Sequence, residues 1–175
     1  MQEMKLSGRL ENDKVIVKEN GEETFNSGWY GKFENGVLEL DFIEALSLME
    51  REKLELHSHK DIVNFREFYN HCYNGNPKFS ALYTVYRDLR ERGLTVRLGF
   101  KGTDLRVYDR GAKPDKKTDV KWIVFIESED YPCELSKLGK LMGLAENIRA
   151  VALWAVVDND SDVTYYIVQD KTKQL

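Results

Sequence analysis

The sequence predicts an α+β fold in two domains: a small N-terminal mixed α/β domain, and a C-terminal domain with a central mixed β-sheet flanked by helices. The chain has 175 residues, 42% of them apolar, which is enough for one sizeable domain or two small ones. The turn-forming run Asn-Gly-Asn-Pro at 74–77 marks a boundary, so the domains span 1–76 and 77–175. After it, the patterns follow the order α-β-β-β-α-β-β, which favours a mixed sheet with helices packed against it.

The first domain is predicted from short strands separated by turns, followed by helices. Asn-Gly at 35–36, between two apolar runs, is a strong hairpin signal. Asp41 precedes a helical period and suits its N-cap. The expected strands are 5–10, 14–17, 29–33, 37–40 and 53–57, and the expected helices are 42–51 and 60–73.

The second domain has a more regular pattern. A helix beginning at 79 stops at Gly93, which can adopt the left-handed conformation that ends helices. Pro132 introduces a long amphipathic helix, and its inward face is expected to carry Leu135, Leu138, Leu141, Leu144, Ala145 and Ile148. The expected strands are 94–100, 105–108, 120–126, 151–157 and 163–168, with a Lys-rich loop at 109–118 and an acidic turn at 158–162.

Composition limits the classes of protein that the chain can belong to. Its net charge of −4 means that any nucleic-acid role needs a local basic patch or a basic partner. Cys72 and Cys133 lack the spacing of a zinc site or a redox pair, so buried free thiols in a reducing cytosol are expected. The sequence shows neither a leader nor an apolar run long enough to cross a bilayer, so we expect a cytoplasmic protein without membrane contact.

The histidines are the first candidates for chemistry. His57 and His59 would face the same way in a strand, which suits a metal, but no third ligand stands at a recognisable spacing. Two surface histidines and no metal site are therefore expected, and His71 suits a polar tip near a helix end. No Ser-His-Asp order, glycine-rich phosphate loop or paired-carboxylate motif stands out.

Two blocks of the second domain point to a family. Residues 83–93 read YTVYRDLRERG and residues 96–108 read VRLGFKGTDLRVY. They resemble the archaeal tRNA-splicing endonuclease family, and the likeness continues at 155–158 and 163–166 and, in the first domain, at 29–32 and 38–48. The resemblance implies a nuclease-type C-terminal domain. It also implies metal-free and cofactor-free RNA cleavage at intron–exon junctions, leaving a cyclic phosphate and a 5′-hydroxyl.

The resemblance also assigns the chemistry to a Tyr, a His and a Lys, and only the first is present. Tyr108 matches the Tyr, whereas Asp119 stands at the His position and Ala150 at the Lys position. A carboxyl group with a reference pKa of about 3.9 is ionised at neutral pH and donates a proton poorly, and alanine offers no charge to a phosphorane. Gly143 stands where cleaving members usually carry an Arg. No catalytic residue is therefore expected, and Tyr108 is expected to be vestigial and held by packing.

The resemblance implies a structural subunit of a heterotetramer with two copies each of this chain and a catalytic subunit, acting on precursor tRNA. In the family an acidic loop docks into a neighbouring subunit, although an ordinary hairpin explains this turn equally well. The expected docking residues are Asp158, Asp160, Asp162, Val163, Tyr165 and Ile167. Candidates for RNA contact are Arg106, Arg110, Lys113, Lys116 and Lys117, although a solvated charged face explains most of them equally well.

Two alternatives remain open from the sequence. One is an active endonuclease of altered chemistry that uses Tyr108 and a lysine from 113–121. The other is a homodimeric RNA-binding scaffold that has left tRNA processing.

Overall fold

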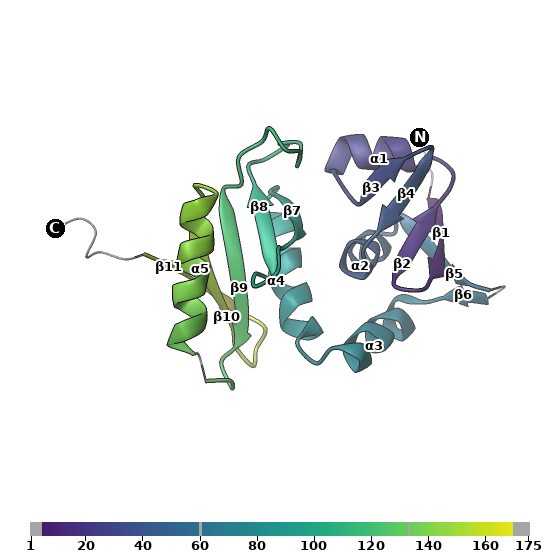
Figure 1. Cartoon of the computed structure of the whole chain (residues 1–175). Coiled ribbons are helices and arrows are strands. Elements are labelled where there is room, and N and C mark those ends of the chain that lie inside the picture. The colour runs from purple at the N-terminus through teal and green to yellow at the C-terminus, as the bar shows by residue number, and fades with distance from the viewer. Residues whose placement is uncertain (1–4, 60, 133, 170–175) are drawn as a thin grey trace. The chain divides into compact units, whose positions relative to one another are not determined.

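The computed structural model describes residues 5–59, 61–132 and 134–169 (Figure 1). The chain divides into two compact units, Met1–Phe79 and Ser80–Leu175, and each is described by itself. The predicted fold class is confirmed, because each unit is a β-sheet with helices packed on it. No helix of the described part is long and apolar enough to span a membrane.

The N-terminal unit is built on a six-stranded sheet with the order β3-β4-β2-β1-β5-β6. Its central strand β1 pairs antiparallel with β2 and parallel with β5. The strands are β1 (Leu6–Glu11), β2 (Lys14–Val17), β3 (Lys32–Glu34), β4 (Val37–Leu40), β5 (Leu54–Ser58) and β6 (Asp61–Val63), and the helices are α1 (Gly21–Gly28), α2 (Phe42–Glu50) and α3 (Phe65–Gly75).

Alternation along the strands gives this sheet one apolar and one polar face. The apolar side chains at alternate positions are buried beneath the helices: Leu6, Val15, Val17, Leu38, Leu40, Leu54 and Leu56. Helix α2 lies against β2, β4 and β5, and α1 lies against β3 and β4. Arg9, Ile16 and His57 occupy the intervening positions and therefore face outward on the open side.

Glu44 fixes the start of α2 to the chain ahead of β3. Its buried carboxylate accepts hydrogen bonds from the backbone N–H of Asp41 and of Gly31, each at 3.0 Å. Gly31 has a φ of +65°, and a Cβ there would lie 2.2 Å from the carbonyl oxygen of Glu39. Only glycine fits this connection without a shift of the backbone.

The C-terminal unit is a five-stranded mixed sheet with the order β11-β10-β9-β8-β7. Strands β9 and β10 are parallel and the other pairs are antiparallel. The elements are α4 (Phe79–Glu91), β7 (Thr95–Leu98), β8 (Leu105–Tyr108), β9 (Trp122–Ser128), α5 (Leu135–Asn147), β10 (Val151–Val157) and β11 (Val163–Val168), in the predicted order.

Helices cover both faces of this sheet. Helix α5 packs on β9 and β10 through a cluster that includes Ile123, Leu141, Ala145 and Ala152. The residues of β9 and β10 that point the other way, such as Val124 and Ala155, are also fully buried, and Figure 1 shows α4 on that side of the sheet.

Four expectations for the N-terminal unit were wrong or incomplete. Helix α1 and strand β6 were not predicted, and the strand expected at 29–33 begins at Lys32, because Trp29 has a φ of 54° and ends α1. The helix expected from 60 starts at Phe65, because Asn64 caps it. The side chain of Asn64 accepts from the N–H of Glu67, whose carboxylate accepts from the N–H of Asn64.

The predicted inward face of the long helix is correct except at its beginning. Leu135 is 83% exposed, and Leu138 is the first residue of the row that packs against the α5 cluster. Leu135 is the first residue of α5 and lies one turn before that packing starts. Cys72 is a buried free thiol, whereas Cys133 lies outside the described residues.

Candidate functional site

One end of the C-terminal sheet gathers the three positions that the sequence singled out. Strand β8 ends at Tyr108, and β9 and β10 begin close by. The N–H of Lys121 donates to the carbonyl of Val107 at 2.9 Å, and the N–H of Val151 donates to the carbonyl of Lys121 at 3.0 Å. Asp119 lies just before β9 and Ala150 just before β10, so both come to the Tyr108 end of the sheet.

Tyr108 is enclosed at this end. The whole residue is only 2% exposed. Its backbone pairs with Thr95 on β7. A tyrosine this deeply packed presents little surface to a substrate.

The positions around Tyr108 supply neither an imidazole nor a free ammonium. Asp119 is exposed and Ala150 is half-buried. The histidines of the chain are at 57, 59 and 71, all in the N-terminal unit. Gly143 lies on α5, and a Cβ added there would meet nothing within 4 Å.

Lys121 lies at this end of the sheet, where its backbone bonds to Val107 and Val151. Its ammonium pairs with the carboxylate of Asp109 and lies 4.9 Å from the centre of the Trp122 ring. An ion pair and a cation–π contact both stabilise the positive charge of the ammonium. The charge of Lys121 is thus already engaged within the unit.

The Lys-rich loop leaves the sheet at the same end. The loop exposes Arg110, Lys113, Lys116 and Lys117. Asp115 shapes the loop: its carboxylate accepts from the N–H groups of Lys117 at 2.9 Å and Thr118 at 3.1 Å. These hydrogen bonds, first that from Lys117, lower the pKa of Asp115.

Arg106 differs from the other RNA-contact candidates. It is half-buried, its Nε donates to the carbonyl of Leu98 at 2.9 Å, and its guanidinium lies 4.4 Å from the centre of the Phe100 ring. This arginine is engaged inside the unit.

The acidic turn lies at the opposite end of the sheet, where β9 and β10 end and β11 begins. The carboxylate of Asp158 is directed inward and accepts from the N–H groups of Asp160 at 3.0 Å and Asp162 at 2.9 Å. The carboxylates of Asp160 and Asp162 are exposed and make no ion pair or hydrogen bond with the described residues. One carboxylate of the turn, that of Asp158, thus stabilises the turn itself, and the carboxylates of Asp160 and Asp162 point outward.

Strand β11 is an edge of the sheet, paired with β10 on one side. Ile167 is 65% exposed and Val163 is half-buried. Tyr166, which the sequence analysis did not select, is 49% exposed, and its ring lies 5.4 Å from that of Trp154. An exposed apolar edge is a surface that a partner can cover.

Tyr165, by contrast, is tied into the unit. Its hydroxyl donates to Asp88 at 2.6 Å, and Arg92 donates to both oxygens of that carboxylate at 2.9 and 3.1 Å. Burial and then the Asp88 carboxylate raise the pKa of Tyr165 well above its ordinary value, and the Asp88 hydrogen bond raises the pKa of Arg92. The Asp88–Arg92 spacing of four on a helix was visible in the sequence, but its link to Tyr165 was not.

The histidine pair does not share a strand face as expected. His57 lies in β5, but His59 follows the end of that strand with a φ of 56°. Within the described ranges, no group of three or more His, Cys, Asp or Glu side chains is placed to hold a metal ion.

Two family profiles match the chain. One is described as the tRNA intron endonuclease N-terminal domain and covers residues 6–69. The other is described as the tRNA intron endonuclease catalytic C-terminal domain and covers residues 79–165, a range that contains Tyr108, Asp119 and Ala150.

Similar proteins are named tRNA-splicing endonuclease. The one from Methanothermobacter thermautotrophicus is 34% identical over 94% of this chain and 97% of its own length. That from Thermococcus kodakarensis is 35% identical over 83% of this chain and 84% of its own length. That from Methanococcoides burtonii is 36% identical over 94% of this chain, but the chain spans only 46% of that relative.

The similarity thus runs through both units and includes relatives of the same length as well as relatives about twice as long. The chain belongs to the tRNA intron endonuclease family.

Proposed function

We propose that this chain is a structural, non-cleaving subunit that positions catalytic subunits on precursor tRNA. The observation that carries the proposal is the Tyr108 end of the C-terminal sheet. Cleavage to a cyclic phosphate needs a base for the ribose 2′-hydroxyl, an acid for the leaving 5′-oxygen and a cation for the charge on phosphorus. Here Tyr108 is buried, and the positions that precede the strands beginning at this end are occupied by Asp119 and Ala150.

The altered-chemistry alternative finds little support at this end. Lys121, one of the lysines it would use, is engaged with Asp109 and Trp122. Lys113, Lys116 and Lys117 stand in the exposed loop that leaves the sheet at this end, and Asp115 shapes that loop. These loop lysines, with Arg110, suit contacts to RNA phosphates better than chemistry.

The opposite end of the sheet supports an assembly role. Asp160 and Asp162 present two carboxylates, and beside them runs the open edge of β11 with Tyr166 and Ile167 exposed. A basic partner surface would complement the charges, and burial of the edge would remove a site for self-association. Of the six predicted docking residues, Asp160, Asp162 and Ile167 carry this part of the proposal, because Asp158 and Tyr165 make internal hydrogen bonds.

The test is reconstitution with a catalytic subunit of the family, one that carries His and Lys where this chain has Asp119 and Ala150. Each chain is purified separately and incubated with a precursor tRNA that contains an intron. We expect cleavage at both junctions from the mixture and none from this chain alone, and a native mass corresponding to two copies of each chain. Cleavage by this chain alone would contradict the structural role.

A further inference from the structure

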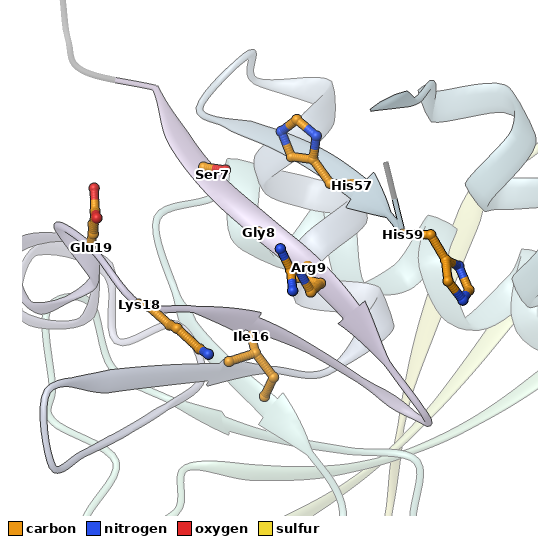
Figure 2. Close-up of a pocket in the computed structure, with 8 residues that line it drawn as sticks. All are labelled: Ser7, Gly8, Arg9, Ile16, Lys18, Glu19, His57 and His59. Carbon is orange, nitrogen blue, oxygen red and sulfur yellow. The ribbon is translucent and has the colours of Figure 1, made fainter. Parts of the chain in front are cut away.

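A hollow of about 430 Å³ opens on the polar face of the N-terminal sheet (Figure 2). Its lining includes Ser7, Arg9, Ile16, Lys18, His57 and His59. These residues come from β1, from the end of β2 and from the end of β5. None of them belongs to the Tyr108 end or to the acidic turn, which lie in the other unit.

Strand register places the polar groups next to one another. Arg9 is the partner of Ile16 on β2 and of His57 on β5, so the three form a row across adjacent strands. Lys18 directly follows Val17, the partner of Gly8, and so stands opposite Ser7, two positions beyond Ile16 on the strand next to Arg9. The helices cover the other face of the sheet, which leaves this row open to solvent.

The two cations of the hollow have no counter-ion among the residues that the structure describes. Arg9 and Lys18 make no ion pair or hydrogen bond with any described residue, whereas Lys14 and Lys32 on the same sheet pair with Asp41 and Glu34. Figure 2 shows the Lys18 side chain extending toward the Arg9 side of the hollow.

One acidic side chain, Glu19, is among the residues that line the hollow. Glu19 lies at the margin, and Figure 2 shows its carboxylate turned away from Arg9. The carboxylate of Glu55 is paired with His57: its Oε1 lies 3.0 Å from Nε2 of the histidine. With Arg9 and Lys18 against Glu19, the charged side chains of the lining are positive on balance.

We propose that this hollow binds a phosphate group. A guanidinium offers paired N–H donors that match phosphate oxygens, an ammonium adds a point charge, and the Ser7 hydroxyl and imidazole N–H groups can donate further hydrogen bonds. The volume exceeds that of one phosphate and leaves room for an attached sugar, against which Ile16 supplies an apolar side. The phosphate group can come from an RNA backbone or from free inorganic phosphate. The RNA source rests on the proposed function.

The three histidines allow a direct test by NMR on the full chain. The ring signals of His57 and His59 report on the hollow, and His71 on α3, packed against Phe42 at 5.9 Å, is an internal reference. One arm adds inorganic phosphate and the other a single-stranded RNA 12-mer, both at constant pH and at ionic strength matched with chloride. We expect the His57 and His59 signals to shift saturably while that of His71 stays in place.

The two titrations, with RNA and with inorganic phosphate, distinguish the two sources of the phosphate group. Saturable shifts with the RNA identify the phosphodiester backbone, and shifts with inorganic phosphate alone identify a small phosphate ligand. No shift in either arm overturns the proposal. Because cleavage and assembly do not enter this measurement, its failure is distinct from a failure of the structural role.

Variants then test which residues bind. Arg9→Gln and Lys18→Gln should each weaken binding of the RNA about 3–10-fold and lower the slope of log affinity against log salt by about 0.7. Lys32→Gln removes the same charge from the same sheet, where the lysine is paired with Glu34, and should weaken binding less than about twofold. Equal losses from Arg9→Gln and Lys32→Gln would mean that only net charge matters and would overturn the site.

Discussion

Cys72 shows how burial sets the chemistry of a single residue. It lies on the inner side of α3 and is 6% exposed. Burial disfavours the thiolate and raises the pKa of the thiol to about 11. In the unfolded chain the pKa would be about 8.5, so the folded state holds its proton over a wider range of pH.

This difference predicts slow alkylation of Cys72 in the folded protein. In a Cys133→Ser variant, which leaves Cys72 as the one thiol of the sequence, iodoacetamide should react slowly at pH 8 and faster once the chain is unfolded. Because the folded pKa is the higher one, the free energy of unfolding should fall as the pH rises from about 8.5 toward 11. A native reaction rate that follows a titration near 8.5 would contradict the burial.

At the scale of single residues, the sequence predicted which positions come together at the site, but not which contacts their side chains make. It marked Tyr108, Asp119 and Ala150, and the structure brings all three positions to one end of a sheet. It could not predict that Arg106 would stack on Phe100 or that Lys121 would pair with Asp109, because these contacts form only when strands align. The candidate site residues stay predictions until they are tested.

At the scale of elements, strand β11 depends on a polar contact with α4. The carboxylate of Asp88 accepts hydrogen bonds from the Tyr165 hydroxyl and from Nε and Nη2 of Arg92. The Arg92 guanidinium also lies 5.7 Å from the centre of the Tyr165 ring. A hydrogen bond to a charged acceptor in a partly buried place stabilises more than one in water. This contact stabilises β11, an edge strand that pairs with β10 on one side only.

Tyr165→Phe should therefore lower the free energy of unfolding by about 1–2 kcal/mol and speed amide exchange in β11. Tyr166→Phe is the matched control, since the hydroxyl of Tyr166 makes no hydrogen bond with a described residue and its loss should cost less than about 0.5 kcal/mol. Chemical denaturation and hydrogen exchange measure both effects. Equal effects of the two variants would show that the Asp88 contact does not hold the strand.

Elements with a strong local pattern were predicted closely, and those that depend on distant partners were not. The expected strands at 14–17, 37–40, 105–108, 151–157 and 163–168 coincide with β2, β4, β8, β10 and β11. Helix α1 is short and carries only one large apolar side chain, Phe25. It is held against Leu38, whose Cβ lies 2.6 Å from where a Cβ of Gly21 would be. Strand β6 has three residues and exists through its pairing with β5.

At the scale of the whole molecule, each unit contributes its own residues to the proposed roles. In the C-terminal unit, the Lys-rich loop leaves the Tyr108 end of the sheet, and the acidic turn and the start of β11 lie at the other end. In the N-terminal unit, the cationic hollow faces outward from the sheet. The separation of the two ends of the C-terminal sheet suits a chain that contacts RNA and a partner subunit at the same time.

Removing the two outward charges of the acidic turn should weaken assembly. Asp160→Asn with Asp162→Asn should slow association with the catalytic subunit about tenfold at low salt and flatten its salt dependence. Glu11→Gln with Asp13→Asn makes the same change of charge in the exposed β1–β2 turn and should leave association unchanged. Stopped-flow or surface-binding kinetics compare the two pairs, and equal slowing by both would attribute the effect to net charge alone.

The most direct test of the structural role asks whether the Tyr108 hydroxyl takes part in cleavage. The measurement is the single-turnover rate of precursor-tRNA cleavage by the reassembled complex, with Tyr108→Phe in this chain and, in parallel, the equivalent change in the catalytic subunit. Removal of a proton-transfer group typically costs about 10²–10⁴-fold in rate. We predict that loss for the catalytic subunit and a change of less than about twofold for this chain. A hundredfold loss from Tyr108→Phe would show that this chain performs the chemistry itself.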